Sequence, residues 1–181
     1  MRIISGTKGG IIIHAPAKLP VRPTTDYAKT GIFNILNNHF DFEEISVLDL
    51  FSGTGNISYE FASRGCRDIY CVDTSASCVN FIRETSLKLG FDGIRTIKSD
   101  VFRFLKSPQR KFDIVFADPP FDMKESADIP DLVFQGDWLK EDGWLIFEHQ
   151  SKFQLINTKN LKETRHYGNC AFSIFTSGDT H

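Results

Sequence analysis

Strand-like and helix-like segments alternate along the chain from residue 45 onward, and this alternation constrains the fold more than any other feature. Five short apolar runs are predicted to form strands, at 46–50, 69–72, 94–97, 113–117 and 144–148. Apolar residues recur at helical spacing in the segments between them, at roughly 56–64, 76–89, 101–106 and 125–139. Such a β-α-β order predicts an α/β fold with a mostly parallel sheet and helices on both faces.

A hairpin is predicted to close one edge of this sheet. Leu161–His166 and Ala171–Thr176 are strand-like and flank the turn residues Tyr167-Gly168-Asn169. Two antiparallel strands here would bring the sheet to seven.

The first 40 residues follow a different pattern. The short runs Arg2–Gly6 and Gly10–His14 are punctuated by glycines and predict a β-hairpin arm. Prolines then favour extended chain from Ala15 to Pro23. Thr24-Thr25-Asp26 offers an N-cap for a helix at about 25–38. We therefore expect an N-terminal extension, residues 1–40, attached to a main domain, residues 41–181.

Bulk properties narrow the class of protein. A chain of 181 residues suits one hydrophobic core. It contains no apolar stretch of the roughly 18–20 residues that a membrane helix needs, and its start lacks the pattern of a signal peptide, so the cytoplasm is the expected location. The four cysteines fit no zinc-binding spacing, so we expect reduced, partly buried thiols and no metal site.

Charge is distributed unevenly. The net charge is −2, but residues 1–40 hold five basic side chains against one acidic, whereas residues 41–181 hold 16 basic and 22 acidic. A basic arm on an acidic body suggests that the arm meets nucleic-acid phosphates. Chance clustering of charges on a solvated face is the alternative explanation.

A glycine-containing loop follows the first predicted strand, in the segment Val47–Asn56. Glycines at Gly53 and Gly55, beside Phe51, would let the backbone approach a ligand at the carboxyl end of the strand. The dinucleotide fingerprint would require a third glycine where Ser58 stands, so the match to NAD is poor. Asp49 suits a cofactor with a cationic end, such as the amino group of S-adenosylmethionine (SAM).

Two further acidic residues stand at strand ends. Asp73 ends the second strand and can accept hydrogen bonds from both hydroxyls of an unphosphorylated ribose. Asp100 follows the third strand, where its carboxylate can accept from an adenine amino group while the backbone N–H of Val101 serves a ring nitrogen. A single aspartate here is more often a helix cap, but three at matching strand ends favour a nucleoside cofactor.

The fourth strand runs into Asp118-Pro119-Pro120-Phe121, which we take as the catalytic segment. Consecutive prolines stiffen the backbone after the strand. A phenylalanine ring that is exposed past a strand end is expected to stack on a planar ligand. The partner that fits is a base with an exocyclic amino group. Phe121 would stack on the ring, while the Asp118 carboxylate and the Pro119 carbonyl hold the nitrogen in line with the methyl donor. Such a base must be flipped out or single-stranded.

The sequence resembles the RsmD family, which methylates guanine N2 in small-subunit ribosomal RNA (rRNA), over nearly its whole length. The tetrad resembles the motif of amino methyltransferases that act on adenine N6 or guanine N2. Besides it and the cofactor loop, the matching segments are Arg2–Gly6 with Lys8-Gly9-Gly10, Arg22–Asp26, Phe33–Leu36 and the closing hairpin. Gly31, Asn56 and Asp73 depart from the family pattern, and Lys8-Gly9-Gly10 carries fewer basic residues than usual.

This resemblance implies a Rossmann-like class I SAM-dependent methyltransferase with rRNA, in a small-subunit particle, as its partner. The hairpin would grip the RNA and the Arg22–Asp26 loop would help to close the active site, which makes the expected substrate-binding residues Arg2, Lys8, Arg22, Thr24 and Thr25. A monomer is the default expectation.

Three other functions stay open on the sequence. The tetrad alone also fits an adenine-N6 methyltransferase that acts on DNA or another RNA. The basic arm fits a non-catalytic RNA-binding assembly factor equally well. A NAD oxidoreductase is less favoured because of Ser58.

Overall fold

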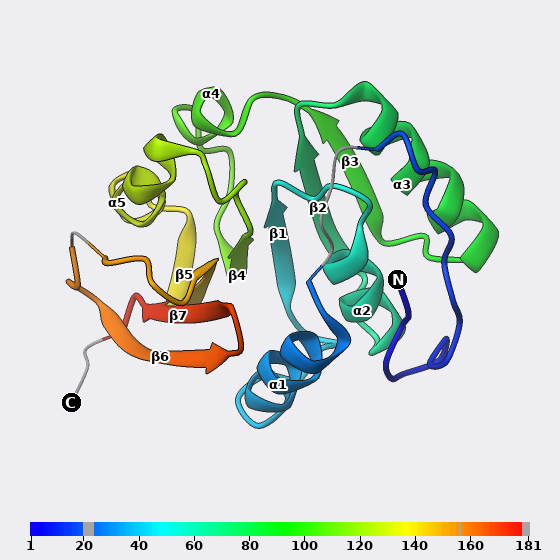
Figure 1. The fold of residues 1–181 in the computed structure, drawn as a ribbon, viewed down its shortest axis with the longest axis horizontal. Coiled ribbons are helices and arrows are strands. Elements are labelled where there is room, and N and C mark those ends of the chain that lie inside the picture. Colours follow the sequence, from blue (N-terminus) through cyan, green and yellow to red (C-terminus); the bar gives the residue numbers. More distant parts are fainter. Residues whose placement is uncertain (20–23, 156, 179–181) are drawn as a thin grey trace.

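The computed structural model describes residues 1–19, 24–155 and 157–178. Its centre is one seven-stranded sheet in the order β3-β2-β1-β4-β5-β7-β6 (Figure 1). The strands are β1 (Ser46–Leu50), β2 (Asp68–Asp73), β3 (Ile94–Lys98), β4 (Phe112–Ala117), β5 (Leu139–Gln150), β6 (Leu161–Tyr167) and β7 (Cys170–Thr176). Strands β1 to β5 pair in parallel, and β7 pairs antiparallel with both β5 and β6. The predicted fold class is confirmed, including the closing hairpin.

Helices cover both faces of the sheet (Figure 1). Apolar side chains of α1 (Asp26–Asn37), α2 (Asn56–Ser63) and α3 (Ala76–Leu89) share one buried cluster with residues of β1 and β4. A second cluster joins α4 (Val101–Leu105) and α5 (Ile129–Gln135) to the opposite face. Alternate residues of each central strand therefore face different helical layers, as expected for a parallel sheet buried on both sides.

The predicted helix at 125–139 is wrong in its length and in its continuity. The segment begins as a 3-10 helix, η1 (Lys124–Asp128), and continues as α5, which carries a proline, Pro130, in its first turn. The helix ends before Gly136 because the chain must bring Trp138 into the core, where its indole N–H donates to the Leu105 carbonyl at 3.1 Å. Strand β5 then starts at Leu139, five residues before the predicted start.

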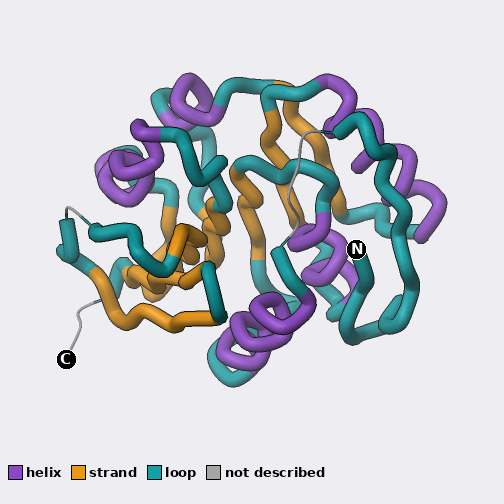
Figure 2. Tube along the Cα trace, viewed as in Figure 1, coloured by secondary structure: helices purple, strands orange, loops and turns teal. Residues whose placement is uncertain are grey.

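The N-terminal hairpin arm is also less regular than predicted. Its two sides form one isolated antiparallel bridge, between Arg2 and Ile12, with backbone hydrogen bonds around it such as that from the Ile3 N–H to the Ile11 carbonyl at 3.0 Å. Figure 2 draws this region as loop. The first run of the arm also contacts α2 through its backbone. The N–H groups of Ile4 and Ser5 donate to Glu60, at 2.8 and 3.1 Å. The first run of the arm is thus bound to the helix.

Residues 1–40 share the core of the main domain. Ile3 and Ile13 are buried in the same cluster as helix α1 and the sheet. The extended chain predicted from Ala15 to Pro23 is interrupted by a turn in which the Leu19 N–H donates to the Pro16 carbonyl at 3.1 Å. Residues 20–23 of that prediction lie outside the described residues. A boundary at residue 40 remains a prediction from sequence.

Glycine in the middle of α1 has a packing role. A Cβ atom added at Gly31 would lie 2.1 Å from the Tyr167 ring of the closing hairpin. The helix therefore accepts a residue of poor helix propensity so that β6 can approach it closely. The same approach places the rings of Tyr27 and Tyr167 edge to face, 5.6 Å apart.

Two further expectations concern the burial of the cysteines and the absence of a membrane-spanning helix. Cys66, Cys71 and Cys78 are buried and Cys170 is half-buried, in agreement with the predicted burial of these side chains. Among the described residues, no helix has the length and apolar character needed to cross a membrane.

Candidate active site

The sheet reverses its strand order between β1 and β4. Strands β2 and β3 extend from β1 on one side, and β5 extends from β4 on the other. In open α/β sheets the carboxyl ends of the strands at such a point form a crevice that binds ligands. Asp49, Phe51 and the Asp118–Phe121 segment all come from these two neighbouring strand ends.

The loop between β1 and α2 has the backbone geometry that its glycines permit. Gly53 and Gly55 have φ angles of 53° and 83°, in the left-handed region. A Cβ at Gly55 would lie 2.7 Å from the ring of Tyr59, so the close turn requires glycine. Phe51 adopts a φ of 60°, a conformation rare outside glycine, and its half-buried ring packs edge to face with Phe102 of α4.

Asp49 is 2% exposed and lies beneath this loop. The Ser58 hydroxyl donates to its carboxylate at 2.5 Å, so the residue that weakens the NAD match supports this acidic group. Burial raises the pKa of the Asp49 carboxyl to about 7, and the charge of Asp73 adds to the rise. A cation bound beside Asp49 would stabilise its ionised carboxylate and lower this pKa again.

Asp73 holds the loop in place. One of its carboxylate oxygens accepts from the Gly53 N–H at 2.8 Å, and the other accepts from the Ser75 N–H at 2.8 Å. Each carboxylate oxygen has a second lone pair with which it can accept a ribose hydroxyl. The predicted ribose contact is thus compatible with the structure.

Asp100 and Val101 begin α4. The Asp100 carboxylate caps the helix by accepting from the Arg103 N–H at 2.9 Å, which is the structural role anticipated for a single aspartate at a strand end. Val101 is buried as the first residue of the helix, where backbone N–H groups have no partner within the helix. Contact with adenine remains a prediction for both.

The predicted catalytic segment, Asp118–Phe121, leaves β4 as a stiff turn. Asp118 is half-buried, Pro119 is buried, and Pro120 and Phe121 are exposed, with Phe121 at 38%. Loss of hydration raises the pKa of the Asp118 carboxyl well above its ordinary value, and the charges of Glu148 and Asp49 add to the effect. The structure therefore gathers the carboxyl groups of Asp49, Asp118 and Glu148 at the turn that leaves Phe121 exposed.

Sequence reasoning missed Glu148, which ends the apolar part of β5 and is 4% exposed. The Thr24 hydroxyl donates to its carboxylate at 2.7 Å. The sequence held a signal for this residue, because Glu148 is an acidic residue at the end of a predicted strand, as Asp73 is.

A buried polar network supports Thr24. The Asn56 amide donates to the Thr24 carbonyl at 3.2 Å and accepts from the Lys29 ammonium at 2.8 Å. Lys29 also donates to the Arg2 carbonyl at 2.6 Å and lies 3.5 Å from Glu60. The polar residue at the start of α2, a departure from the family pattern, is therefore part of this network.

The predicted substrate-binding residues are not all gathered at the strand ends. Thr24 lies against Glu148, whereas Thr25 is the N-cap of α1 and accepts from the Ala28 N–H. Arg2 pairs with Asp26 at 3.0 Å, and Lys8 is half-buried on the arm beside α2. Arg22 lies outside the described residues.

One basic residue of the first 40 cannot contact phosphate. The side chain of Lys29 is fully buried, and burial lowers its pKa. The proposed basic arm therefore carries less accessible charge than its sequence suggests.

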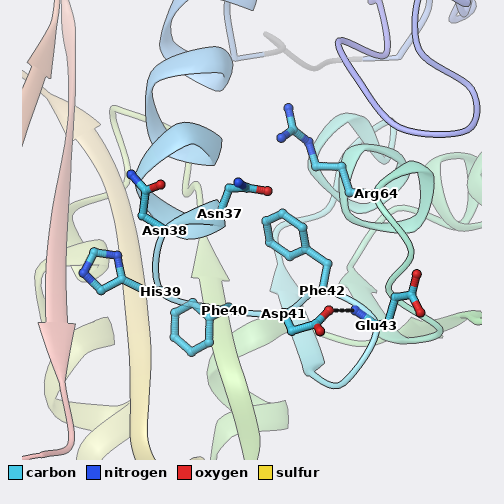
Figure 3. A pocket seen from close by; sticks show the side chains of 8 residues that line it. All are labelled: Asn37, Asn38, His39, Phe40, Asp41, Phe42, Glu43 and Arg64. Atoms are coloured by element: carbon cyan, nitrogen blue, oxygen red, sulfur yellow. Dashed lines mark hydrogen bonds between the residues drawn. The ribbon is translucent and has the colours of Figure 1, made fainter.

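An open hollow of about 520 Å³ lies away from these strand ends. Its lining comes from the end of α1, the chain that precedes β1, and the C-cap of α2, all at the amino edge of the sheet (Figure 3). The lining residues are Asn37, Asn38, His39, Phe40, Asp41, Phe42, Glu43 and Arg64. None of the predicted site residues is among them, and the described residues contain no cluster that could hold a metal ion.

Comparison with known proteins decides the family. The family model described as "Conserved hypothetical protein 95" matches residues 1–176. The ribosomal RNA small subunit methyltransferase D of Haemophilus influenzae is 31% identical over 176 residues, covering 90% of this chain and 87% of the relative. This chain belongs to the RsmD family.

Two more comparisons give a further relative and a structural neighbour. The enzyme of the same name from Buchnera aphidicola subsp. Baizongia pistaciae is 27% identical over 87% of this chain and 80% of its own length. The solved structure of a hypothetical protein from Thermus thermophilus has a TM-score of 0.85 at 24% identity, and the match covers 97% of this chain and 98% of the other. This likeness shows a shared fold.

As an RsmD-family protein, the chain is a methyltransferase that uses SAM. Its residues fit that cofactor, because the buried Asp49 carboxylate lacks the stabilisation that an ammonium group would give, and the glycine turn admits close approach. Asp49 would hold the amino group and Asp73 the ribose. When bound, SAM supplies an electrophilic methyl group on a positively charged sulfur.

Proposed function

We propose that this protein transfers a methyl group from SAM to the exocyclic N2 amino group of a guanine in small-subunit rRNA. The observation that carries the proposal is the position of Asp118-Pro119-Pro120-Phe121 beside Asp49 at the reversal of strand order. The names of the H. influenzae and B. aphidicola relatives supply the RNA class.

The chemical role of the segment is to position the target nitrogen. The exposed ring of Phe121 stacks on the base, and the Asp118 carboxylate and Pro119 carbonyl accept from the amino group. Their geometry turns the nitrogen lone pair out of the ring plane and toward the methyl donor. The methylated nitrogen is strongly acidic and loses its proton readily, so no strong base is required before transfer.

Electrostatics in the site favour a cationic methyl donor. Asp49 and Asp118 both have raised pKa values, because burial and neighbouring carboxylates disfavour their charged forms. A positive charge nearby stabilises both ionised carboxylates, so cofactor binding would prepare Asp118 to accept hydrogen bonds from the amino group.

RNA would be held by exposed basic groups of the N-terminal extension. Lys8 lies on the hairpin arm and is half-exposed, and Lys18 lies in the segment that follows it and is exposed. The target base must leave any duplex to reach Phe121. We further propose a small-subunit particle as the substrate, a cytoplasmic location and a monomeric enzyme.

Transfer of labelled methyl groups tests the proposal. Small ribosomal subunits that lack the modification are incubated with labelled SAM, and the modified nucleoside is identified by mass. We expect N2-methylguanosine with the wild-type protein and at least a roughly 100-fold slower reaction with Asp118→Ala. Asp92→Ala, at a position before β3 and away from the strand ends of the site, is the matched control and should react normally.

Two outcomes would favour the other functions. N6-methyladenosine as the product would identify an adenine-N6 methyltransferase. Tight binding to subunits without turnover under any condition would identify an assembly factor.

A further inference from the structure

The position of Glu148 suggests a role in choosing the base. Strands β4 and β5 are parallel neighbours, with Ala117 opposite Phe147. Both of these residues belong to the cluster on the α4–α5 face, so the next pair, Asp118 and Glu148, points to the opposite face. Adjacent strands lie about 4.8 Å apart, which places two carboxylates side by side at the strand ends.

The Glu148 side chain is held in this position. Thr24 donates to it at 2.7 Å, and Thr24 is itself fixed through Asn56 and the fully buried Lys29. The charge of Glu148 reaches Asp118, whose pKa it raises. A buried carboxylate is costly unless hydrogen-bond donors face it, and a carboxylate can accept about four hydrogen bonds. A carboxylate at this position has the capacity to accept from Thr24 and from a base at the same time.

The two candidate bases present different edges to such a pair of acceptors. Guanine carries its N2 amino group next to an N1–H, so two donor groups stand side by side. Adenine carries its N6 amino group next to an N1 lone pair, which is an acceptor. An ionised carboxylate only accepts hydrogen bonds, so it can pair with the guanine N1–H but is repelled by the lone pair on adenine N1.

We propose that Glu148 accepts the N1–H of the target guanine while Asp118 accepts from its N2 amino group, so that Glu148 selects guanine over adenine. This inference rests on the proposed guanine-N2 activity. It gives Thr24 a defined function, because Thr24 positions the selecting carboxylate.

The base 2-aminopurine provides the test, since it keeps the amino group at C2 but has a lone pair in place of the N1–H. Small subunits are assembled from rRNA with guanine or 2-aminopurine at the mapped target nucleotide. We expect wild-type kcat/KM to be at least about 100-fold lower for 2-aminopurine. Glu148→Gln should narrow this ratio to within about tenfold, because the Gln amide can donate to the N1 lone pair. Glu141→Gln, an exposed position on the same strand, should keep the wild-type ratio.

Three results would overturn the inference, and each has a different meaning. A Glu148→Gln variant that retains the full wild-type preference for guanine would show that Glu148 does not read N1. A variant that slows both substrates equally, with SAM affinity intact by calorimetry, would show a structural role. A wild-type enzyme that methylates adenine would remove the proposed function itself, together with this inference.

Discussion

Asp118 is assigned a positioning role, and two substitutions distinguish it from a catalytic base. Asparagine keeps an oxygen that can accept from the amino group but cannot take up a proton at neutral pH. We expect Asp118→Asn to retain a rate within about tenfold of wild type, whereas Asp118→Ala loses about 100-fold or more. Single-turnover methyl transfer measures both. Equal, severe losses in the two variants would assign Asp118 the role of base.

Asp49 should make cofactor binding depend on pH. Its pKa in the free protein is about 7, and an ammonium partner lowers that value in the complex. Below about pH 7, SAM binding therefore requires Asp49 to release a proton. The affinity for SAM should fall as the pH falls, with a loss that approaches roughly tenfold for each pH unit. Calorimetry across this range, from mildly acidic to mildly basic pH, measures the slope. Asp49→Asn should bind SAM weakly and with a shallower pH dependence, since Asp118 is then the remaining carboxyl group with a raised pKa. A variant that keeps the full wild-type slope would contradict this role.

At the residue scale, position relative to strand ends made most of the site predictable. Asp49, Asp73, Asp100 and Asp118 all lie where the alternation of strands and helices placed them. Lys29 could not be predicted, because its burial depends on Glu60 and Asn56, which are distant in sequence.

Helix α1 and hairpin β6–β7 meet at Gly31 and Tyr167, and this contact allows a stability test. On an isolated helix, alanine would be favoured over glycine by about 1 kcal/mol. Here we expect Gly31→Ala to destabilise the protein by about 1–3 kcal/mol, since the added methyl overlaps the Tyr167 ring. Denaturant unfolding measures the change. In a Tyr167→Ala background the same substitution should be neutral or stabilising; an unchanged cost there would exclude the tyrosine as the cause.

Element types were more predictable than element bounds. Strand β1 and helix α3 match their predicted ranges because apolar periodicity and capping residues agree there. The helix predicted at 125–139 does not match, because the helical spacing of apolar residues continues past Gly136 to Trp138. In the structure the helix ends earlier, and Trp138 packs in the core outside the helix. The arm has one bridge among its described residues, and its first run is held by hydrogen bonds to Glu60 and Ser63 of α2, which are distant in sequence.

At the scale of the whole molecule, the arm's integration into the core changes how RNA binding should be tested. Truncation would remove Ile3 and Ile13 from the core, so charge removal is the cleaner experiment. We expect Lys8→Gln with Lys18→Gln to weaken RNA binding and to make the slope of log affinity against log salt shallower by roughly two, with SAM affinity unchanged. Lys88→Gln with Lys159→Gln, at positions outside the arm, is the matched control. A slope unchanged in the first pair would mean that the arm does not contact phosphates.

The central claim joins a cofactor site, a base site and an RNA class in one molecule, and nucleoside mass analysis tests all three together. Small-subunit rRNA is prepared from cells with and without this protein and digested to nucleosides. We predict that the cells lacking the protein lose one N2-methylguanosine per small subunit and that purified protein with SAM restores it. Unchanged N2-methylguanosine, or loss of N6-methyladenosine in its place, would contradict the account.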